Sequence, residues 1–299
     1  MIASKRMIAF PDISPEIFSV NLFGFNFALR WYAVSYIMGF ICALQLMKFF
    51  ISKNFLWPEH SPPISKSQAD SLLTYLIFGV IIGGRLGYVL FYNFGYYIQN
   101  PGSIIRVWDG GMAFHGGFIG VVLAAIIFCR LHSVSLWSTA DLVAIATPPG
   151  LFFGRVANFI NAELWGRPTD VPWGVIFPSE LAQQCEAVTG PCARHPSQLY
   201  EAGLEGIILF LLLYCLVVYG AFTKRGFVTG IFVAGYGLSR FIVEYFRVPD
   251  PQFFSPANPY GLALQINEYG LTMGQLLSLP MFILGVILCV RCLYRDDTI

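Results

Sequence analysis

Long apolar segments separated by short polar ones run along almost the whole chain. A helix that crosses a membrane needs about 20 mostly apolar residues. Seven segments meet this requirement: 28–50, 70–94, 112–131, 138–160, 203–222, 226–246 and 271–292. The fourth is the weakest because Pro148, Pro149 and Gly150 interrupt it, although membrane helices tolerate such residues where neighbouring groups satisfy the freed backbone. The pattern predicts an all-α polytopic membrane protein with about seven transmembrane helices.

Composition supports this interpretation and removes several alternatives. Only 12% of the 299 residues are charged and 56% are hydrophobic, whereas a soluble domain carries about 25% charged residues. A soluble enzyme, a disordered chain and a coiled coil are therefore excluded. The formal net charge of +1 supplies no basic surface for nucleic acid, so we expect no nucleic-acid partner.

Basic residues in the loops indicate which side of the membrane each loop faces. The loops after the first, third and fifth segments and the tail contain Lys53, Lys66, Arg130, Lys224, Arg225 and Arg291. Lysine and arginine accumulate in cytoplasmic loops, so we expect the N-terminus outside and the C-terminus in the cytoplasm. The long outward loop 161–202 is predicted to form an ordered cap, with 247–270 as a second element. We expect residues 1–299 to form a single integral-membrane domain that includes both cap segments.

The seven cysteines fit no zinc-binding spacing. Five lie in or beside apolar segments and are predicted to be small buried hydrophobic residues. Cys185 and Cys192 instead fall in the polar segment 161–202. If that segment lies outside the cytoplasm, a disulfide between them is as plausible as two free thiols.

Polar side chains fall toward the outer ends of the predicted helices. They are Arg30, Tyr32, Arg85, Tyr88, His115, Arg155, Asn158, Asn161, Glu163, Tyr236, Arg240, Glu244 and Arg247. Ionisable side chains in a membrane segment cost free energy and are functional candidates by default. An isolated arginine there costs about 2.5–3.5 kcal/mol. Arg85, Arg155 and Arg240 lie a turn or more inside their segments, so each needs a partner.

Two explanations for these arginines stay open. The first is structural pairing, since Glu244 lies one turn from Arg240 and could form an ion pair with it. Likewise, Glu163 could pair with Arg155 or Arg167. The second is an anionic ligand that enters from the outer leaflet. Arginine without lysine at that depth favours bidentate binding of phosphate.

The end of the fourth segment and one histidine add further polar groups. Arg155, Asn158 and Asn161 are spaced three apart, near one helical face, with Glu163 on the adjacent side if the helix persists. Such a face is typical of a lined cavity. His115 lies among the glycines of WDGGMAFHGGFIG; a lone histidine is usually a hydrogen-bonding group, but the arginines at the same depth favour a catalytic role. Metal-binding and nucleotide-binding motifs are absent from the sequence, and GGRLG at 83–87 favours helix packing.

Six motifs together are similar to those of bacterial prolipoprotein diacylglyceryl transferases. In chain order they are RWY (30–32), GGRLGYVLFYN (83–93), WDGGMAFHGGFIG (108–120), GRVANFINAELWGR (154–167), RHPSQLYE (194–201) and GLSRFIVEYFRVPD (237–250). The resemblance covers nearly the whole chain. Ala33, Ala113 and Ala162 stand where the family is expected to have Gly, Ser and Gly, which affects only local packing.

The resemblance implies transfer of the diacylglyceryl group of phosphatidylglycerol to the lipobox cysteine thiol of a preprolipoprotein. A thioether forms and glycerol-1-phosphate leaves, the first step of bacterial lipoprotein maturation. It also implies the cytoplasmic (inner) membrane, an active site toward the outer leaflet and no cofactor. The residues expected to be catalytic are His115, Arg155, Glu163, Tyr236 and Arg240. Those expected to bind substrate are Tyr32, Arg85, Arg155, Asn158, Asn161, Arg240 and Arg247.

The implied chemistry agrees with the positions of the polar groups. Arg155 and Arg240 would hold the phosphate of the leaving group and stabilise its growing charge. His115 is our hypothesis for the general base that takes the thiol proton, and Glu163, Tyr236 or water are the alternatives.

Two other classes of function compete with a diacylglyceryl transferase. A transporter or lipid flippase would use buried arginines to pass an anionic substrate, but transporter sites usually lie near the midplane between internal repeats, and no repeat is visible. A phosphatase acting on lipid headgroups in the same leaflet is the other alternative. The six motifs favour the transferase.

Overall fold

The computed structural model describes residues 7–22, 25–185, 190–249, 251–253, 255, 258–266 and 269–294. The sequence predicts the N-terminus outside and the C-terminus in the cytoplasm, and both terminal segments lie outside these described residues. The chain divides into two compact units. Unit 1 consists of Met1–Ala43 and Ala144–Ile299, and unit 2 consists of Leu44–Val143.

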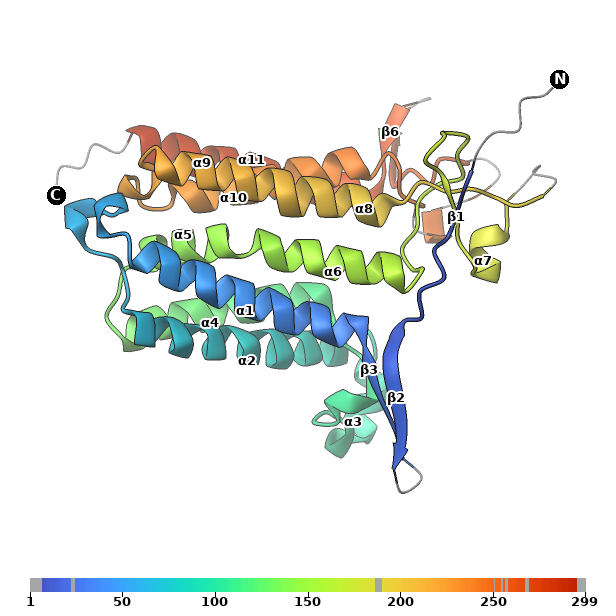
Figure 1. Cartoon of the computed structure of the whole chain (residues 1–299), viewed down its shortest axis with the longest axis horizontal. Coiled ribbons are helices and arrows are strands. Elements are labelled where there is room, and N and C mark those ends of the chain that lie inside the picture. The colour runs from blue at the N-terminus through green and yellow to red at the C-terminus, as the bar shows by residue number, and fades with distance from the viewer. Residues whose placement is uncertain are drawn as a thin grey trace. The chain divides into compact units, whose positions relative to one another are not determined.

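Helices make up most of the described residues (Figure 1). The long ones are α1 (Trp31–Ile51), α2 (Lys66–Phe91), α4 (Phe114–Leu131), α5 (Leu136–Ala146), α6 (Pro148–Ile160), α9 (Leu209–Val218), α10 (Phe227–Val243) and α11 (Met273–Tyr294). Among the described residues, six helical stretches are long and apolar enough to cross a membrane, and α10 is a shorter apolar helix. The predicted all-α polytopic membrane fold with about seven helices is confirmed.

The predicted interruption of the fourth segment is present. Helix α5 ends at Ala146 and α6 begins at Pro148. Proline has no N–H group and its ring clashes with the preceding turn, so a helix stops before it and a new one starts with it at the first position. Pro148 is buried, so the break lies inside the protein.

Three predicted helix starts were wrong by three or more residues. Helix α2 starts at Lys66, four residues before the predicted residue 70. Residues 28–30 end the strand β3 (Phe25–Arg30), which pairs antiparallel with β2 (Glu16–Leu22), and α1 starts only at Trp31. The fifth helix begins before the predicted residue 203, with α8 (Ser197–Glu201). Its first turn, SQLYE, is polar, and apolar content alone therefore placed it in the loop.

Helix α8 continues without a break through the π-helical turn η5 (Ala202–Ile208) into α9 (Figure 1). π-Helical turns are rare and are frequently found at functional sites. η5 packs closely on α6, because a Cβ atom on Gly206 would lie 2.6 Å from the Phe152 Cβ. Glycine at this position allows the two backbones to approach.

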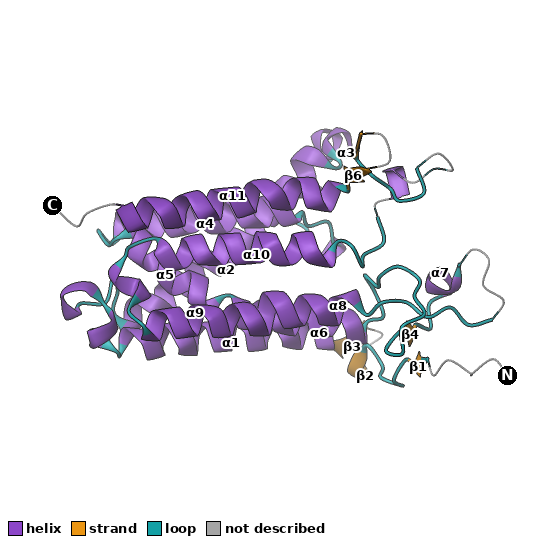
Figure 2. Ribbon diagram, turned by 90° about the horizontal axis from the view of Figure 1, so that it is seen from above, coloured by secondary structure: helices purple, strands orange, loops and turns teal. Residues whose placement is uncertain are grey.

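The loop from α6 to α8 forms an ordered cap over its described residues, as predicted. Figure 2 shows this loop with β1 and β4 at the ends of α6 and α8. Strand β4 (Val175–Ile176) pairs parallel with β1 (Ile8–Ala9), and the short helix α7 (Glu180–Gln183) follows. The buried side chains of Val175, Phe177 and Ala182 form a small apolar core. The cap ends at residue 196 rather than 202.

A disulfide joins Cys185 and Cys192 in the cap, so one of the two alternatives left open by the sequence is settled. Arg194 follows it and is buried, with a guanidinium that donates to the carbonyls of Ala182, Gly166 and Gln184. Residues 186–189 lie outside the described part of the chain.

A chain of hydrogen bonds leads to the histidine at the end of the cap. Trp173 Nε1 donates to the Tyr200 hydroxyl over 2.8 Å, and that oxygen lies 3.0 Å from His195 Nδ1. Since the hydroxyl accepts from Trp173, it is free to donate its own proton to Nδ1. Burial lowers the pKa of His195, which agrees with a neutral ring at this position.

The second predicted cap segment, 247–270, is described in part. It contains the short turn η7 (Pro251–Phe253) and the strands β5 (Leu264–Ile266) and β6 (Tyr269–Leu271), which pair antiparallel. Residues 250, 254, 256–257 and 267–268 lie outside the described part.

In unit 2, helices α2 and α4 pack through glycines. A Cβ atom on Gly79 would lie 2.6 Å from the carbonyl oxygen of Gly120, and one on Gly87 would lie 2.7 Å from the Cα of Gly116. Only glycine permits such backbone contact. The sequence GGRLG therefore serves helix packing, as predicted.

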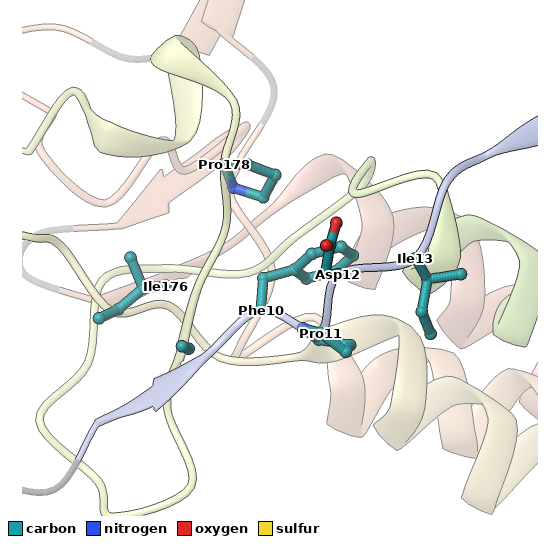
Figure 3. Close-up of a pocket in the computed structure, with 7 residues that line it drawn as sticks. Phe10, Pro11, Asp12, Ile13, Ile176 and Pro178 are labelled. Carbon is teal, nitrogen blue, oxygen red and sulfur yellow. The ribbon is translucent and has the colours of Figure 1, made fainter.

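A cavity of about 370 Å³ opens beside β1 in the cap (Figure 3). Its lining is Ala9, Phe10, Pro11, Asp12, Ile13, Ile176 and Pro178. These residues are mostly apolar and include none of the predicted site residues.

Candidate functional site

Two glutamates on the helix that begins at Ser197 are completely buried. Glu201 ends α8 and Glu205 lies one turn later in η5, and both are 0% exposed. An isolated carboxylate in such a place would be too costly to remain ionised. Each glutamate therefore requires a cationic partner.

Glu201 contacts three arginines. Its carboxylate lies 2.9 Å from Arg155 Nη1, 2.5 Å from Arg240 Nη1 and 2.6 Å from Arg247 Nη1. Arg155 comes from α6, Arg240 from α10 and Arg247 from the segment just after α10. One buried carboxylate therefore joins side chains from three parts of unit 1.

Two further glutamates complete the pairing. Glu205 lies 3.4 Å from Arg155 and 3.6 Å from Arg240. Glu244 lies 3.4 Å from Arg247 and 4.0 Å from Arg240. We call these six residues the charge cluster: Arg155, Arg240, Arg247, Glu201, Glu205 and Glu244.

The charge cluster is neutral in formal charge but not uniform in exposure. The arginine side chains are 18%, 18% and 21% exposed, whereas the glutamates are 0%, 0% and 8% exposed. The carboxylates are therefore more deeply buried than the arginines, and their contacts orient the guanidinium groups. Guanidinium has five N–H donors in a fixed plane, a geometry suited to binding an anion.

The predicted partners of the buried arginines were partly wrong. The pair Glu244–Arg240 is present, at the limiting distance of 4.0 Å. Glu163 pairs with neither Arg155 nor Arg167, because its carboxylate accepts hydrogen bonds from asparagines instead. Arg155 is held by glutamates 46 and 50 residues later in the chain, a separation that local spacing does not reveal.

Sequence reasoning missed Glu201, Glu205 and Gln198. Glu205 could have been predicted as a site residue. It is an acidic residue within an apolar segment, and an ionisable side chain there costs free energy in the same way as the buried arginines. Glu201 lay in the segment assigned to the loop. Gln198 lies in the motif RHPSQLYE (194–201), but no role was assigned to it there, and its importance comes from its burial, at 0% exposed.

Three side-chain amides surround Glu163. Asn158 Nδ2 and Asn161 Nδ2 donate to its carboxylate over 2.8 and 3.4 Å, and Gln198 Nε2 donates to its backbone carbonyl. We call Asn158, Asn161 and Gln198 the amide cluster. The predicted common face of α6 therefore exists for the two asparagines, while Arg155 turns to the charge cluster.

The backbone around Glu163 is strained. Ala162 and Leu164 have φ angles of 52° and 56°, a left-handed conformation that side chains disfavour. This explains why glycine is expected at the position of Ala162, since glycine adopts positive φ without a steric cost. At this strained turn the Glu163 carboxylate meets the asparagines of the amide cluster.

Three tyrosines lie next to these groups. Tyr236 is 9% exposed and sits one turn before Arg240 on α10, near enough to Glu205 to interact electrostatically. The Tyr36 hydroxyl lies 3.4 Å from the hydroxyl of Tyr32. The predicted residue Tyr32 is therefore paired with Tyr36, which the sequence did not single out.

Arg85 has a different environment, inside unit 2. It is 4% exposed, and its guanidinium donates to five backbone carbonyls: Ile104, Gly110, Gly111, Ser103 and Arg106. These bonds occupy all five N–H donors of an arginine. They anchor the segment that leads to α4, and they favour a structural role over the predicted phosphate binding.

His115 lies in the first turn of α4, also in unit 2. Its side chain is exposed, and it has no hydrogen-bond partner among the described residues of that unit. The glycine contacts of α2 and α4 fix the backbone on either side of it.

Comparison with known proteins identifies the family. The sequence profile described as prolipoprotein diacylglyceryl transferase matches residues 19–291. The chain belongs to this family. A phosphatidylglycerol–prolipoprotein diacylglyceryl transferase of Ruegeria pomeroyi is 57% identical over 288 residues, covering 96% of this chain and 98% of the relative. Proteins of the same name from Cereibacter sphaeroides and Rhizobium leguminosarum bv. trifolii are 58% and 45% identical over 285 and 282 residues. They cover 95% and 94% of this chain, and 97% and 92% of their own lengths.

Membership of the diacylglyceryl transferase family confirms the resemblance inferred from the six motifs. Three of those motifs, 154–167, 194–201 and 237–250, supply five of the six residues of the charge cluster, all but Glu205, and the whole amide cluster. Among the described residues, no group of three or more histidine, cysteine or acidic side chains is arranged to hold a metal ion.

Proposed function

We propose that this diacylglyceryl transferase family member moves the diacylglyceryl group of phosphatidylglycerol to the lipobox cysteine thiol of a preprolipoprotein. The sulfur forms a bond to the glycerol carbon of the diacylglyceryl group. The bond from that carbon to the phosphate oxygen breaks, and glycerol-1-phosphate leaves. The observation that carries the proposal is the charge cluster, whose arginines are accessible while their glutamates are buried.

The leaving group explains why the arginines matter. Phosphatidylglycerol has a phosphodiester with one negative charge, and the departing phosphate monoester gains a second one. Arg155 and Arg240 bind the phosphate and stabilise the charge that develops in the transition state. Because Glu201 and Glu205 already orient both guanidinium groups, little reorganisation is needed when the bond breaks.

Other residues bind and position the substrate. Asn158 orients the headgroup, Tyr32 and Arg247 border it, and Asn161 acts with Asn158 around Glu163. For Arg85 the five carbonyl contacts support a structural role instead. The base that takes the thiol proton is assigned to His115, with Glu163, Tyr236 and water as alternatives.

The assay that tests this function uses purified protein, phosphatidylglycerol vesicles and a lipobox peptide. We expect mass spectrometry to detect a peptide heavier by one diacylglyceryl group and an equal amount of glycerol phosphate. Release of inorganic phosphate without modified peptide would indicate a phosphatase. Movement of lipid between leaflets without any covalent product would indicate a flippase. Either result would contradict the proposal.

We also propose that the cap faces the outside of the bacterial cytoplasmic membrane, with the site toward the outer leaflet. The Cys185–Cys192 disulfide supports this orientation, because disulfides persist in oxidising compartments and not in the cytoplasm. The lysines of the opposite loops support it as well.

Labelling of single cysteines tests the orientation. Pro172 in the cap and Lys224 after α9 are both exposed. In a background in which the five cysteines outside the disulfide are replaced by alanine, a membrane-impermeant maleimide should label Pro172→Cys in intact spheroplasts. It should label Lys224→Cys only after permeabilisation. The reverse pattern would place the cap in the cytoplasm.

A further inference from the structure

Gln198 carries a buried side-chain oxygen that no group in the described part of the chain satisfies. The residue is 0% exposed, and its Nε2 donates to the carbonyl of Glu163. Its Oε1 has no hydrogen-bond partner among the described residues. The orientation of the amide follows from this contact, because a flipped amide would place two acceptor oxygens against each other. Oε1 therefore points away from the carbonyl of Glu163.

Asn161 repeats this arrangement on the other side of the same residue. Its Nδ2 faces the Glu163 carboxylate at 3.4 Å, and its buried Oδ1 likewise lacks a partner among the described residues. Each amide donates one hydrogen bond to Glu163 and keeps an acceptor oxygen that has no partner among the described residues. Two unsatisfied acceptors thus flank one residue of the proposed site.

An unsatisfied buried acceptor is rare in native proteins and calls for an explanation. A phosphate has only acceptor oxygens and cannot pair with it, so the arginines and these amides must serve different parts of a ligand. A hydroxyl group can donate to a carbonyl-type oxygen. Gln198 lies one turn before Glu201 on α8, so the free acceptors are found next to the groups that orient the phosphate-binding arginines.

We propose that Gln198 Oε1 and Asn161 Oδ1 accept hydrogen bonds from the hydroxyls of the headgroup glycerol of the donor lipid. This assignment rests on the proposed function and adds a residue that selects the donor. The arginines hold the phosphate that every phospholipid carries, and the two amide oxygens recognise the hydroxylated headgroup. A lipid without headgroup hydroxyls leaves both acceptors buried and unpaired.

Two donor lipids that differ only in these hydroxyls test the assignment. Phosphatidylpropanol has the three-carbon headgroup of phosphatidylglycerol but no hydroxyl on it. We expect the wild-type kcat/KM to be at least about 100-fold higher for phosphatidylglycerol, since sites that bind a substrate hydroxyl reject analogues that lack it by large factors. Equal use of the two lipids by the wild-type protein would overturn the proposal without any variant. Failure to form thioether from either lipid would instead disprove the proposed function.

The variant Gln198→Met keeps the shape of the side chain and removes its oxygen. We expect kcat/KM for phosphatidylglycerol to fall about 10-fold or more, while the value for phosphatidylpropanol changes little. The preference for the hydroxylated lipid should shrink accordingly. Asn161→Leu should act in the same direction and provides a second variant if the first one does not fold.

The matched control is Ser197→Ala. Ser197 is also 0% exposed and donates to the carbonyl of Leu164, the residue after Glu163. It joins the same helix to the same turn but leaves no acceptor unpaired. Its loss should lower both rates by one factor and keep the preference of the wild type. An equal fall for both lipids in Gln198→Met would show a purely structural role and contradict the proposal.

Discussion

The double variant Arg155→Gln, Glu205→Gln is expected to fold but to lose diacylglyceryl transfer. Arg155→Gln alone leaves buried glutamates short of one cation, and breaking a buried ion pair costs about 3–5 kcal/mol. The second change removes one negative charge from the same contact. We therefore expect stability to return to within about 1–2 kcal/mol of the wild type. Transfer should stay at least about 100-fold below it, as when a transition-state donor is removed.

The measurement combines thermal unfolding in detergent with the lipobox-peptide assay. The charge-neutral control is Lys48→Gln with Asp70→Asn, which removes a partly exposed pair at 2.6 Å in unit 2. An exposed pair contributes about 0–1 kcal/mol, so this control should be stable and active. If the Arg155/Glu205 variant transfers lipid at the wild-type rate, the charge cluster only holds the helices together and the phosphate-binding role of Arg155 fails.

The helices were predictable because each has to be apolar over a fixed length. A run of consecutive apolar residues therefore indicates each helix. The break before Pro148 also follows from the sequence, because proline cannot continue a helix. The start of α8 was not predictable in this way. Its first turn contains Ser197, Gln198 and Glu201, whose polar side chains are completely buried inside the protein, so a search for apolar residues places the start of the helix too late.

The residues of the site were also only partly predictable from the sequence. The cost of a buried arginine predicted correctly that Arg155 and Arg240 need partners, but Glu201 is distant in sequence from both. Such pairing depends on the tertiary packing of α6, α8 and α10. For Glu163, closeness in sequence predicted the wrong partner. It is close to Arg155 in sequence, yet the left-handed turn at Ala162 directs it to the asparagines.

His115→Gln is expected to lower the transfer rate at pH 7 by about 100-fold to 10⁴-fold, the usual contribution of a general base. Glutamine keeps the size and polarity of the side chain but cannot take the thiol proton. Raising the pH supplies thiolate without a base, because a free cysteine thiol has a pKa of about 8.5. The gap between variant and wild type should therefore narrow by about tenfold or more between pH 7 and pH 9.

Rates of thioether formation over this pH range decide among the possible bases. His132→Gln is the matched control, since His132 follows the last residue of the same helix α4 and packs on Phe128, and its loss should leave the pH profile unchanged. Glu163→Gln and Tyr236→Phe belong in the same series, because only loss of the true base produces a defect that alkaline pH relieves. A His115→Gln defect that stays constant with pH would mean that the histidine positions a substrate, and the proton would then go to whichever of the other two shows the relief.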